Sequence, residues 1–139
     1  MVTPESLDTS VTLRGAVTRF DELRSRDALA GSASDPEGDG EDLRLPRGQV
    51  LELLALSEVI ARKAGYGRQL VVRSAREAGA SWTEIGRALG TSKQAAWEAH
   101  TRWIAQQAAE HRATGHSGLD ELQAARARRL AGRPDDPVD

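Results

Sequence analysis

The stretch SWTEIGRALGTSKQAAWEAHTRW, residues 81–103, carries the strongest structural signals in this chain. Ser81 lies three residues before Glu84, which is the spacing of a capping box. In that motif a hydroxyl and a side-chain acceptor satisfy the free backbone amides at the start of a helix. The sequence therefore predicts a helix from Trp82 to about Leu89.

A tight turn and a second helix are expected next. Gly90 can adopt the positive φ that ends a helix in a sharp bend. Thr91 or Ser92 can then cap another helix through a side-chain oxygen. This second helix is expected to run through Lys93 and Gln94 and onward.

Two helices joined by so short a turn must pack closely beside it, and close approach requires small residues. Gly86 and Ala96 lie where the helices would touch, and Gly86 lies one helical turn before Gly90. Apolar residues of both helices are expected to fill the interior, namely Trp82, Ile85, Leu89, Ala99 and Trp103. This is the pattern of a helix-turn-helix, whose second helix enters the major groove of DNA.

Residues 75–100, AREAGASWTEIGRALGTSKQAAWEAH, resemble the helix-turn-helix of many small actinobacterial transcriptional regulators. The family pattern is roughly A-A-G-A-S/T-W-x-x-I-G-x-A-L-G-V-S/T-R-Q-A-A-W/H. The stretch is also similar, more distantly, to the region of sigma factors that reads the −35 promoter element. Thr91 replaces the preferred Val of the family and Lys93 its preferred Arg. Lysine keeps the charge but lacks the bidentate fork that reads guanine.

The start of the second helix would meet the DNA first. Thr91 and Ser92 can donate to phosphate beside the positive end of the helix dipole. Lys93 can reach a phosphate or a guanine edge, Gln94 can pair with adenine, and Ala95 can touch a thymine methyl group. The alternative for Lys93 and Gln94 is an ordinary solvated helix start.

Four further residues complete the predicted DNA contacts. Trp97 and Glu98 lie one turn further along, where Glu98 can accept a hydrogen bond from cytosine. Trp97 can instead pack on Leu70 or on a partner chain. Arg87 and Arg102 are candidate contacts to the phosphate backbone, which position a protein without reading sequence.

The charge distribution agrees with this assignment, although the net charge of the chain is −2. Residues 1–45 carry ten acidic and five basic side chains, whereas residues 46–115 carry six acidic and ten basic ones. Residues 116–139 carry five acidic and four basic side chains. The positive charge thus coincides with the proposed motif, and contact with phosphate depends on local charge.

Four regions are expected along the chain. Residues 1–30 contain an amphipathic helix from about 10 to 30, and residues 31–45 form a flexible acidic linker. The linker can alternatively shield a basic face. Residues 46–115 hold the DNA-binding domain, and residues 116–139 hold a short helix and a disordered tail. The apolar face of the first helix would be Leu13, Val17, Phe20 and Leu23.

A long helix is expected from Arg47, with a break at Gly65 and Gly67 and a further helix from about Arg68 to Glu77. Its predicted inward residues are Val50, Leu53, Leu54, Val59 and Ile60, followed by Leu70, Val71 and Ala75. The predicted fold is therefore all-α, with a helix-turn-helix core of three or four helices and an appended N-terminal helix. The helix over 10–30 or the one from Arg47 is expected to form a homodimer contact, because one helix in one groove buries little surface.

An enzyme is not expected, because the sequence lacks a cysteine nucleophile, a phosphate-binding glycine loop and a paired-histidine metal signature. His100, His111 and His116 are interpreted as exposed histidines on a polar helix, so neither a metal nor another cofactor is expected. No apolar run approaches the roughly 20 residues that span a bilayer, and the start of the chain lacks the features of a signal peptide. We therefore expect a cytoplasmic, nucleoid-associated protein without membrane contact.

The main alternative is a sigma-factor-like or adaptor module that uses the same fold to bind protein, with RNA polymerase or a regulatory protein as partner. The two functions predict different surfaces. A DNA reader should expose Arg87, Lys93 and Arg102 beside the second helix. An interaction module should expose an apolar stripe there.

Overall fold

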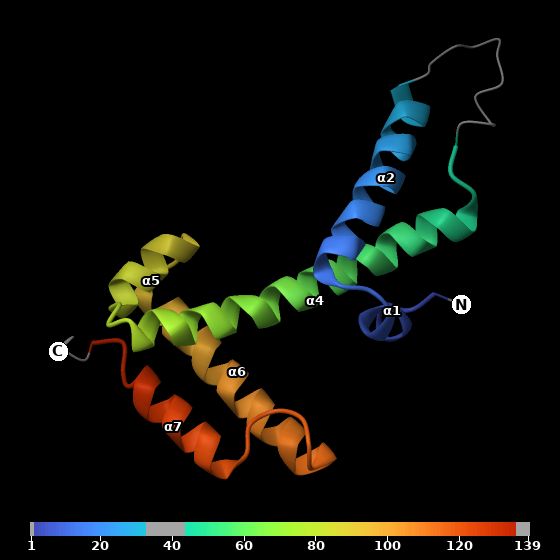
Figure 1. The fold of residues 1–139 in the computed structure, drawn as a ribbon. Helices are drawn as coiled ribbons and strands as arrows, with labels where there is room; N and C mark the ends of the chain where they lie inside the picture. Colours follow the sequence, from blue (N-terminus) through green and yellow to red (C-terminus); the bar gives the residue numbers. More distant parts are fainter. Residues whose placement is uncertain (1, 33–43, 136–139) are drawn as a thin grey trace, which may run out of the picture. The chain divides into compact units, whose positions relative to one another are not determined.

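A computed structural model of the chain describes residues 2–32 and 44–135. All the regular secondary structure of these residues is α-helical (Figure 1), which confirms the predicted all-α class. None of the described helices is long and apolar enough to cross a membrane. The helices are α1 (Pro4–Ser10), α2 (Leu13–Ser32), α4 (Arg47–Glu77), α5 (Trp82–Leu89), α6 (Lys93–Thr114) and α7 (Glu121–Ala131).

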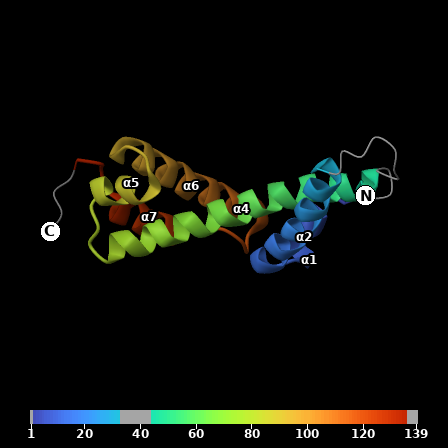
Figure 2. The ribbon, with the colours of Figure 1, turned by 90° about the horizontal axis from the view of Figure 1, so that it is seen from above.

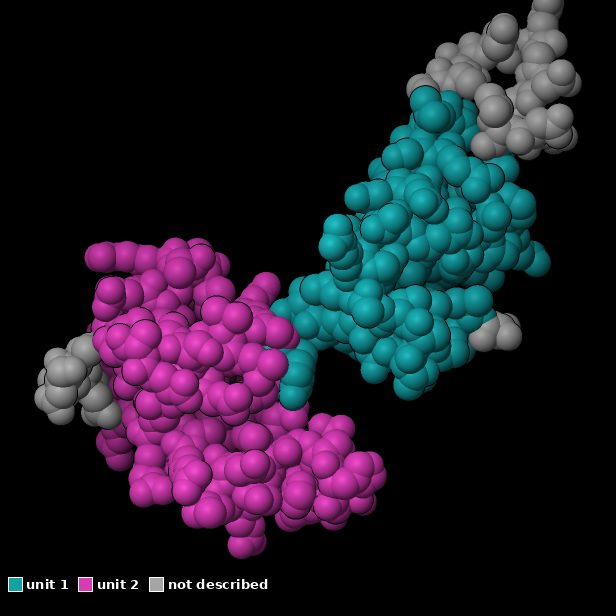
Figure 3. All heavy atoms as spheres, in the orientation of Figure 1, with its two compact units in different colours: residues 1–66 teal, residues 67–139 magenta. Residues whose placement is uncertain are grey.

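The chain divides into two compact units, drawn in teal and magenta in Figure 3. Unit 1 comprises residues 1–66 and unit 2 residues 67–139. The boundary falls inside α4, within the stretch 46–115 that the sequence predicts as one DNA-binding domain. The reason is that the first part of α4 packs in unit 1, whereas α7 packs in the core of unit 2.

Helix α4 corrects the predicted break at Gly65 and Gly67. It runs through both glycines as one helix of 31 residues, and neither glycine has a positive φ. A glycine inside a helix costs only about 1 kcal/mol relative to alanine. Residues on both sides of the glycines are buried within the same helix, Val59 before them and Val72 after them. The prediction of a separate helix over 68–77 is therefore wrong.

Unit 1 is built from α1, α2 and the part of α4 that precedes Gly67. Helix α2 buries Ala16 and Leu23 completely and Phe20 in part. Leu13 and Val17, which were predicted to face inward, are 39% and 38% exposed. Ala16 occupies the contact in their place.

The first part of α4 is apolar over more of its surface than unit 1 covers. Leu53, Leu56 and Val59 are buried, and Ile60 packs against them. Leu54 and Val50, which were predicted to be buried, are 62% and 37% exposed, and Leu51 is exposed as well. A helix buries only one stripe of its surface in a two-layer packing.

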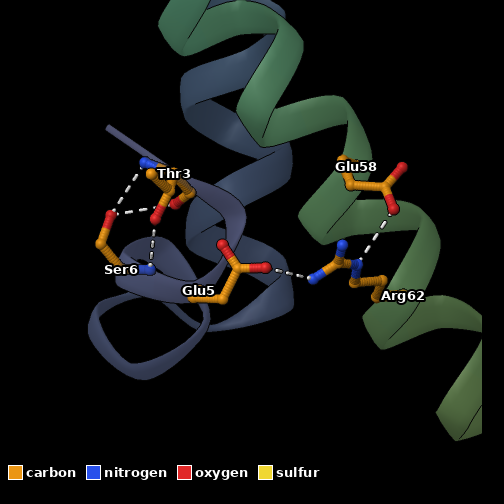
Figure 4. Close-up of polar contacts among 5 residues, drawn as sticks. All are labelled: Thr3, Glu5, Ser6, Glu58 and Arg62. Atoms are coloured by element: carbon orange, nitrogen blue, oxygen red, sulfur yellow. Dashed lines mark hydrogen bonds and ion pairs between the residues drawn. The ribbon is translucent and has the colours of Figure 1, made fainter. Parts of the chain in front are cut away.

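Helix α1, which the sequence analysis did not predict, packs on α4 within unit 1. It begins with a capping box between Thr3 and Ser6. Arg62 of α4 donates to Glu5 at 3.2 Å and to Glu58 at 2.9 Å (Figure 4). Such exposed ion pairs contribute little individually, so the packing of Leu7 against the core of unit 1 is the larger attachment.

In unit 2, helices α5, α6 and α7 gather around the last turns of α4 (Figures 1 and 2). Trp82 and Trp103 are 2% and 7% exposed, which confirms that both belong to the core. Val72 is buried, whereas its predicted inward neighbour Val71 is 67% exposed. The buried cluster consists of Val72, Trp82, Ile85, Ala96, Trp103, Ile104, Ala108, Ala124, Ala127 and Ala131.

Most of the predicted acidic linker, residues 33–43, lies outside the described residues, and so do residues 136–139 of the predicted tail. At the margins of the linker, Gly31 and Ser32 belong to α2 and Leu45 is buried in unit 1. Those margins are therefore parts of the folded unit.

Candidate nucleic-acid interface

Helix α5 begins and ends as its sequence predicts. The hydroxyl oxygen of Ser81 accepts from the Glu84 amide at 3.1 Å, and the Glu84 carboxylate accepts from the Ser81 amide at 3.1 Å. Hydrogen bonds to the Glu84 carboxylate, first from the Ser81 backbone amide and then from the Ser81 side chain, hold the pKa of Glu84 below its ordinary value. Glu84 is therefore a charged capping residue whose carboxylate is engaged at the start of α5.

The turn after α5 depends on two glycines. Gly90 has a φ of 71° in the left-handed region. The amide of Thr91 donates to the carbonyl of Gly86 at 2.8 Å. A Cβ at Gly86 would lie 2.8 Å from the Thr91 carbonyl oxygen and 3.0 Å from the Lys93 amide nitrogen. Only glycine leaves room at this position for the chain that enters α6.

Helix α6 starts immediately after this turn. Ser92 is its N-cap, and the Ser92 hydroxyl accepts from the Ala95 amide at 3.1 Å. Ala96 is 4% exposed and packs in the core with Ile85 of α5. The small residues at the crossing therefore direct the first turn of α6 outward.

The predicted contact residues at the start of α6, apart from Trp97, are exposed on the surface. Those classed as exposed are Thr91, Ser92, Lys93, Gln94, Ala95 and Glu98, together with Arg87 on α5 and Arg102 further along α6. Gln94, Glu98 and Arg102 follow one another at spacings of four, so they share one face of α6. The side-chain amide of Gln94 donates to the Glu98 carboxylate at 2.9 Å.

Trp97 differs from the other predicted contacts because it is only half-exposed. Its ring packs against the core of unit 2, and its indole N–H donates to the Gly132 carbonyl at 2.7 Å. Trp97 thus connects α6 to the end of α7, a partner that the sequence pattern did not indicate.

Large apolar side chains are scarce on this surface. Every residue of α5 and α6 is described, and no large apolar side chain of either helix is among the exposed ones. The described part of unit 2, residues 67–135, carries eleven basic and seven acidic side chains. The outward face of α6 is polar and lies in a unit with a positive balance of charge.

The interpretation of His100 as an exposed histidine is wrong. It is 1% exposed, and its Nδ1 lies 2.9 Å from Oε1 of Gln69 on α4. Its ring centroid lies 5.7 Å from that of Trp82 and 5.6 Å from that of Trp103. Burial, assisted by the positive charges of nearby arginines, lowers the pKa of His100 to about 4. The buried face of α6 places this residue inside because His100 follows Ala96 at a spacing of four.

The depressed pKa of His100 predicts that acid destabilises unit 2. The unfolded chain, with an ordinary histidine pKa of 6.5, takes up a proton that the folded chain does not bind until about pH 4. The contribution of His100 to the free energy of unfolding is therefore fully present above pH 6.5. It is lost on acidification, by on the order of 3 kcal/mol at pH 4.

Urea unfolding between these pH values, followed by tryptophan fluorescence, measures this loss, because all three tryptophans lie in unit 2. His100→Gln keeps a polar partner for Gln69 but does not titrate, so it should lack this part of the pH dependence. Equal pH dependence in the two proteins would contradict the assignment.

The end of α7 is held by donors from other helices of unit 2. The indole of Trp82 donates to the Ala131 carbonyl at 2.7 Å, and the guanidinium of Arg76 donates to the Leu130 carbonyl at 3.1 Å. Together with the bond from Trp97 to Gly132, three consecutive carbonyls at this helix end have side-chain donors. The local sequence pattern does not predict this docking, although a buried indole N–H requires an acceptor.

The docked chain also brings an acidic residue to the start of α6. Asp135 forms an ion pair with Lys93, with Oδ1 2.5 Å from Nζ.

Comparisons of the chain with family models, curated proteins and solved structures found no match. The residues of α5 and α6 and their neighbours therefore carry the functional conclusion.

Proposed function

We propose that the chain is a sequence-specific regulator of transcription that binds double-stranded DNA through α5 and α6 as a helix-turn-helix. The observation that carries the proposal is the glycine-dependent crossing at Gly86 and Gly90, which leaves the first turn of α6 outside the core. A recognition helix must present its first turn and one exposed face to the major groove. The resemblance of residues 75–100 to small actinobacterial regulators supports the same function.

The proposed reading of DNA divides the exposed residues by chemistry. Lys93 and Gln94 face base edges, and Ala95 contacts a thymine methyl group. Thr91, Ser92, Arg87 and Arg102 contact the phosphate backbone. Glu98 orients the amide of Gln94 through their 2.9 Å hydrogen bond, and it is a candidate acceptor for cytosine. Trp97 supports the helix from its half-buried side.

The alternative, a module that binds RNA polymerase or a regulatory protein through the same face, has less support. An interface of that kind would expose a contiguous apolar patch. The exposed face of α6 instead carries Gln94, Glu98 and Arg102. The described large apolar residues that are well exposed lie outside α5 and α6.

We further propose that the protein acts as a homodimer in the cytoplasm, associated with the nucleoid. One recognition helix alone buries too little surface for useful specificity. Unit 1 has exposed apolar residues that can supply the dimer contact, in agreement with the expected role of α2 and the start of α4. These residues are Leu13, Val17, Val50, Leu51 and Leu54.

Selection of bound sites from random DNA duplexes with the intact chain tests this function. The expected result is one enriched sequence, repeated as two half-sites about 10 base pairs apart, or a multiple of that spacing, if a dimer binds. Equal binding to every duplex would contradict sequence-specific recognition. It would indicate a protein that binds only the phosphate backbone of DNA. Failure to bind any duplex at low salt would reject DNA binding and favour the protein-binding alternative.

A further inference from the structure

The chain that follows α7 is anchored beside the predicted DNA-reading surface. The indole N–H of Trp97, which belongs to α6, donates to the Gly132 carbonyl at 2.7 Å. Trp82, which is buried, binds the preceding carbonyl of Ala131. Two fixed points therefore hold the backbone only a few residues before Asp135.

The carboxylate of Asp135 lies on the ammonium group of Lys93, the first residue of α6. In the proposed complex with DNA, a phosphate or the edge of a guanine occupies this position. A carboxylate and a phosphate are both anions and cannot share one lysine ammonium at contact distance without repulsion. The docked segment thus presents an internal competitor to DNA.

We propose that residues 132–135 form an autoinhibitory strap, in which Asp135 holds Lys93 in the free protein and is displaced when DNA binds. This inference rests on the proposed function of α6. After displacement, the DNA backbone or a base edge occupies the position that Asp135 held. The hydrogen bond from Trp97 to Gly132 keeps the strap close enough to return.

The strap is expected to weaken DNA binding without blocking it. The Lys93 and Asp135 side chains are 46% and 77% exposed, and exposed ion pairs contribute only modestly. Removing the competing charge should therefore tighten binding about two- to fivefold at low salt. The gain should shrink as salt screens both the ion pair and the phosphate contacts.

The test compares the full chain with Asp135→Asn, Lys93→Ala and the double variant on a fluorescein-labelled duplex of mixed sequence, about 20 base pairs long. Fluorescence anisotropy measures Kd at about 0.05 M and 0.3 M salt. Glu110→Gln is the matched control, because it removes one negative charge from an exposed position near the far end of α6. Tryptophan fluorescence checks that each variant is folded.

Tighter binding by Asp135→Asn at low salt, with no such gain in the Lys93→Ala background, supports the strap. Equal Kd values for Asp135→Asn and the unmodified chain would overturn it while DNA binding stands. An equal gain in Glu110→Gln, or a gain that persists without Lys93, would also overturn it by showing a general effect of charge. If no variant binds the duplex, including Asp135→Asn, the proposed function fails and the strap fails with it.

Discussion

Replacing Gly118 by alanine is expected to destabilise unit 2 by about 4 kcal/mol, or to prevent its folding. Gly118 has a φ of 78°, which costs an alanine about 1 kcal/mol or more. An added methyl group would also overlap the Gln107 carbonyl oxygen and lie 3.0 Å from the His111 amide nitrogen. Both are backbone atoms of α6, which cannot rotate aside as a side chain would. The clash would also disturb the 3.1 Å hydrogen bond from the Leu119 amide to Gln107.

Gly115→Ala is the matched control for this substitution. Gly115 has nearly the same φ, 77°, but a Cβ there would meet nothing within 4 Å. It should therefore lose only the backbone cost of about 1 kcal/mol. Urea unfolding followed by tryptophan fluorescence reports on unit 2 alone, since Trp82, Trp97 and Trp103 all lie in it. Equal losses in the two variants would contradict the close packing of Gly118 on α6.

The double substitution Lys93→Ala with Gln94→Ala is expected to remove the preference for the selected DNA site. A good bidentate base contact discriminates by about 1–3 kcal/mol. Loss of two base contacts should therefore reduce the ratio of Kd values for a scrambled and the selected duplex by about 100-fold. Both side chains are exposed, so the fold should survive the change.

Two comparisons separate base reading from general attraction to DNA. Gln106→Ala with Arg112→Ala removes similar side chains from exposed positions nearer the far end of α6 and should leave the Kd ratio unchanged. Arg87→Ala and Arg102→Ala should weaken binding to both duplexes equally, and each should lower the salt dependence by about one phosphate contact. An unchanged Kd ratio in the Lys93 and Gln94 double variant would contradict their role as base readers.

The parts of unit 2 that sequence analysis predicted well are those governed by neighbours in the chain. Ser81 and Glu84 are three residues apart, and their capping box needs no distant partner. Gly90 ends α5 because glycine alone tolerates the left-handed backbone at little cost. The bounds of α5 and the start of α6 were therefore predictable within the sequence from 81 to 93.

The errors concern contacts between residues far apart in the chain. The helical pattern of α6 did not show that His100 would be buried and hydrogen-bonded to Gln69, because Gln69 belongs to another helix. The glycines of α4 predict a break, but glycine only weakens a helix, and α4 continues through both of them. The exposed Leu13 and Leu54 illustrate the same limit, since which stripe of an apolar helix is buried depends on its neighbours.

The sequence by itself determined α5, α6 and α7, the glycine turn between α5 and α6, and the residues that we propose for DNA contact. These features follow from backbone preferences and from spacings within one or two helical turns. Only the tertiary structure decided that α7 completes the core, that Trp97 binds Gly132, and that Asp135 reaches Lys93. The last two contacts join residues 35 or more positions apart, and local periodicity holds no information about partners at such distances.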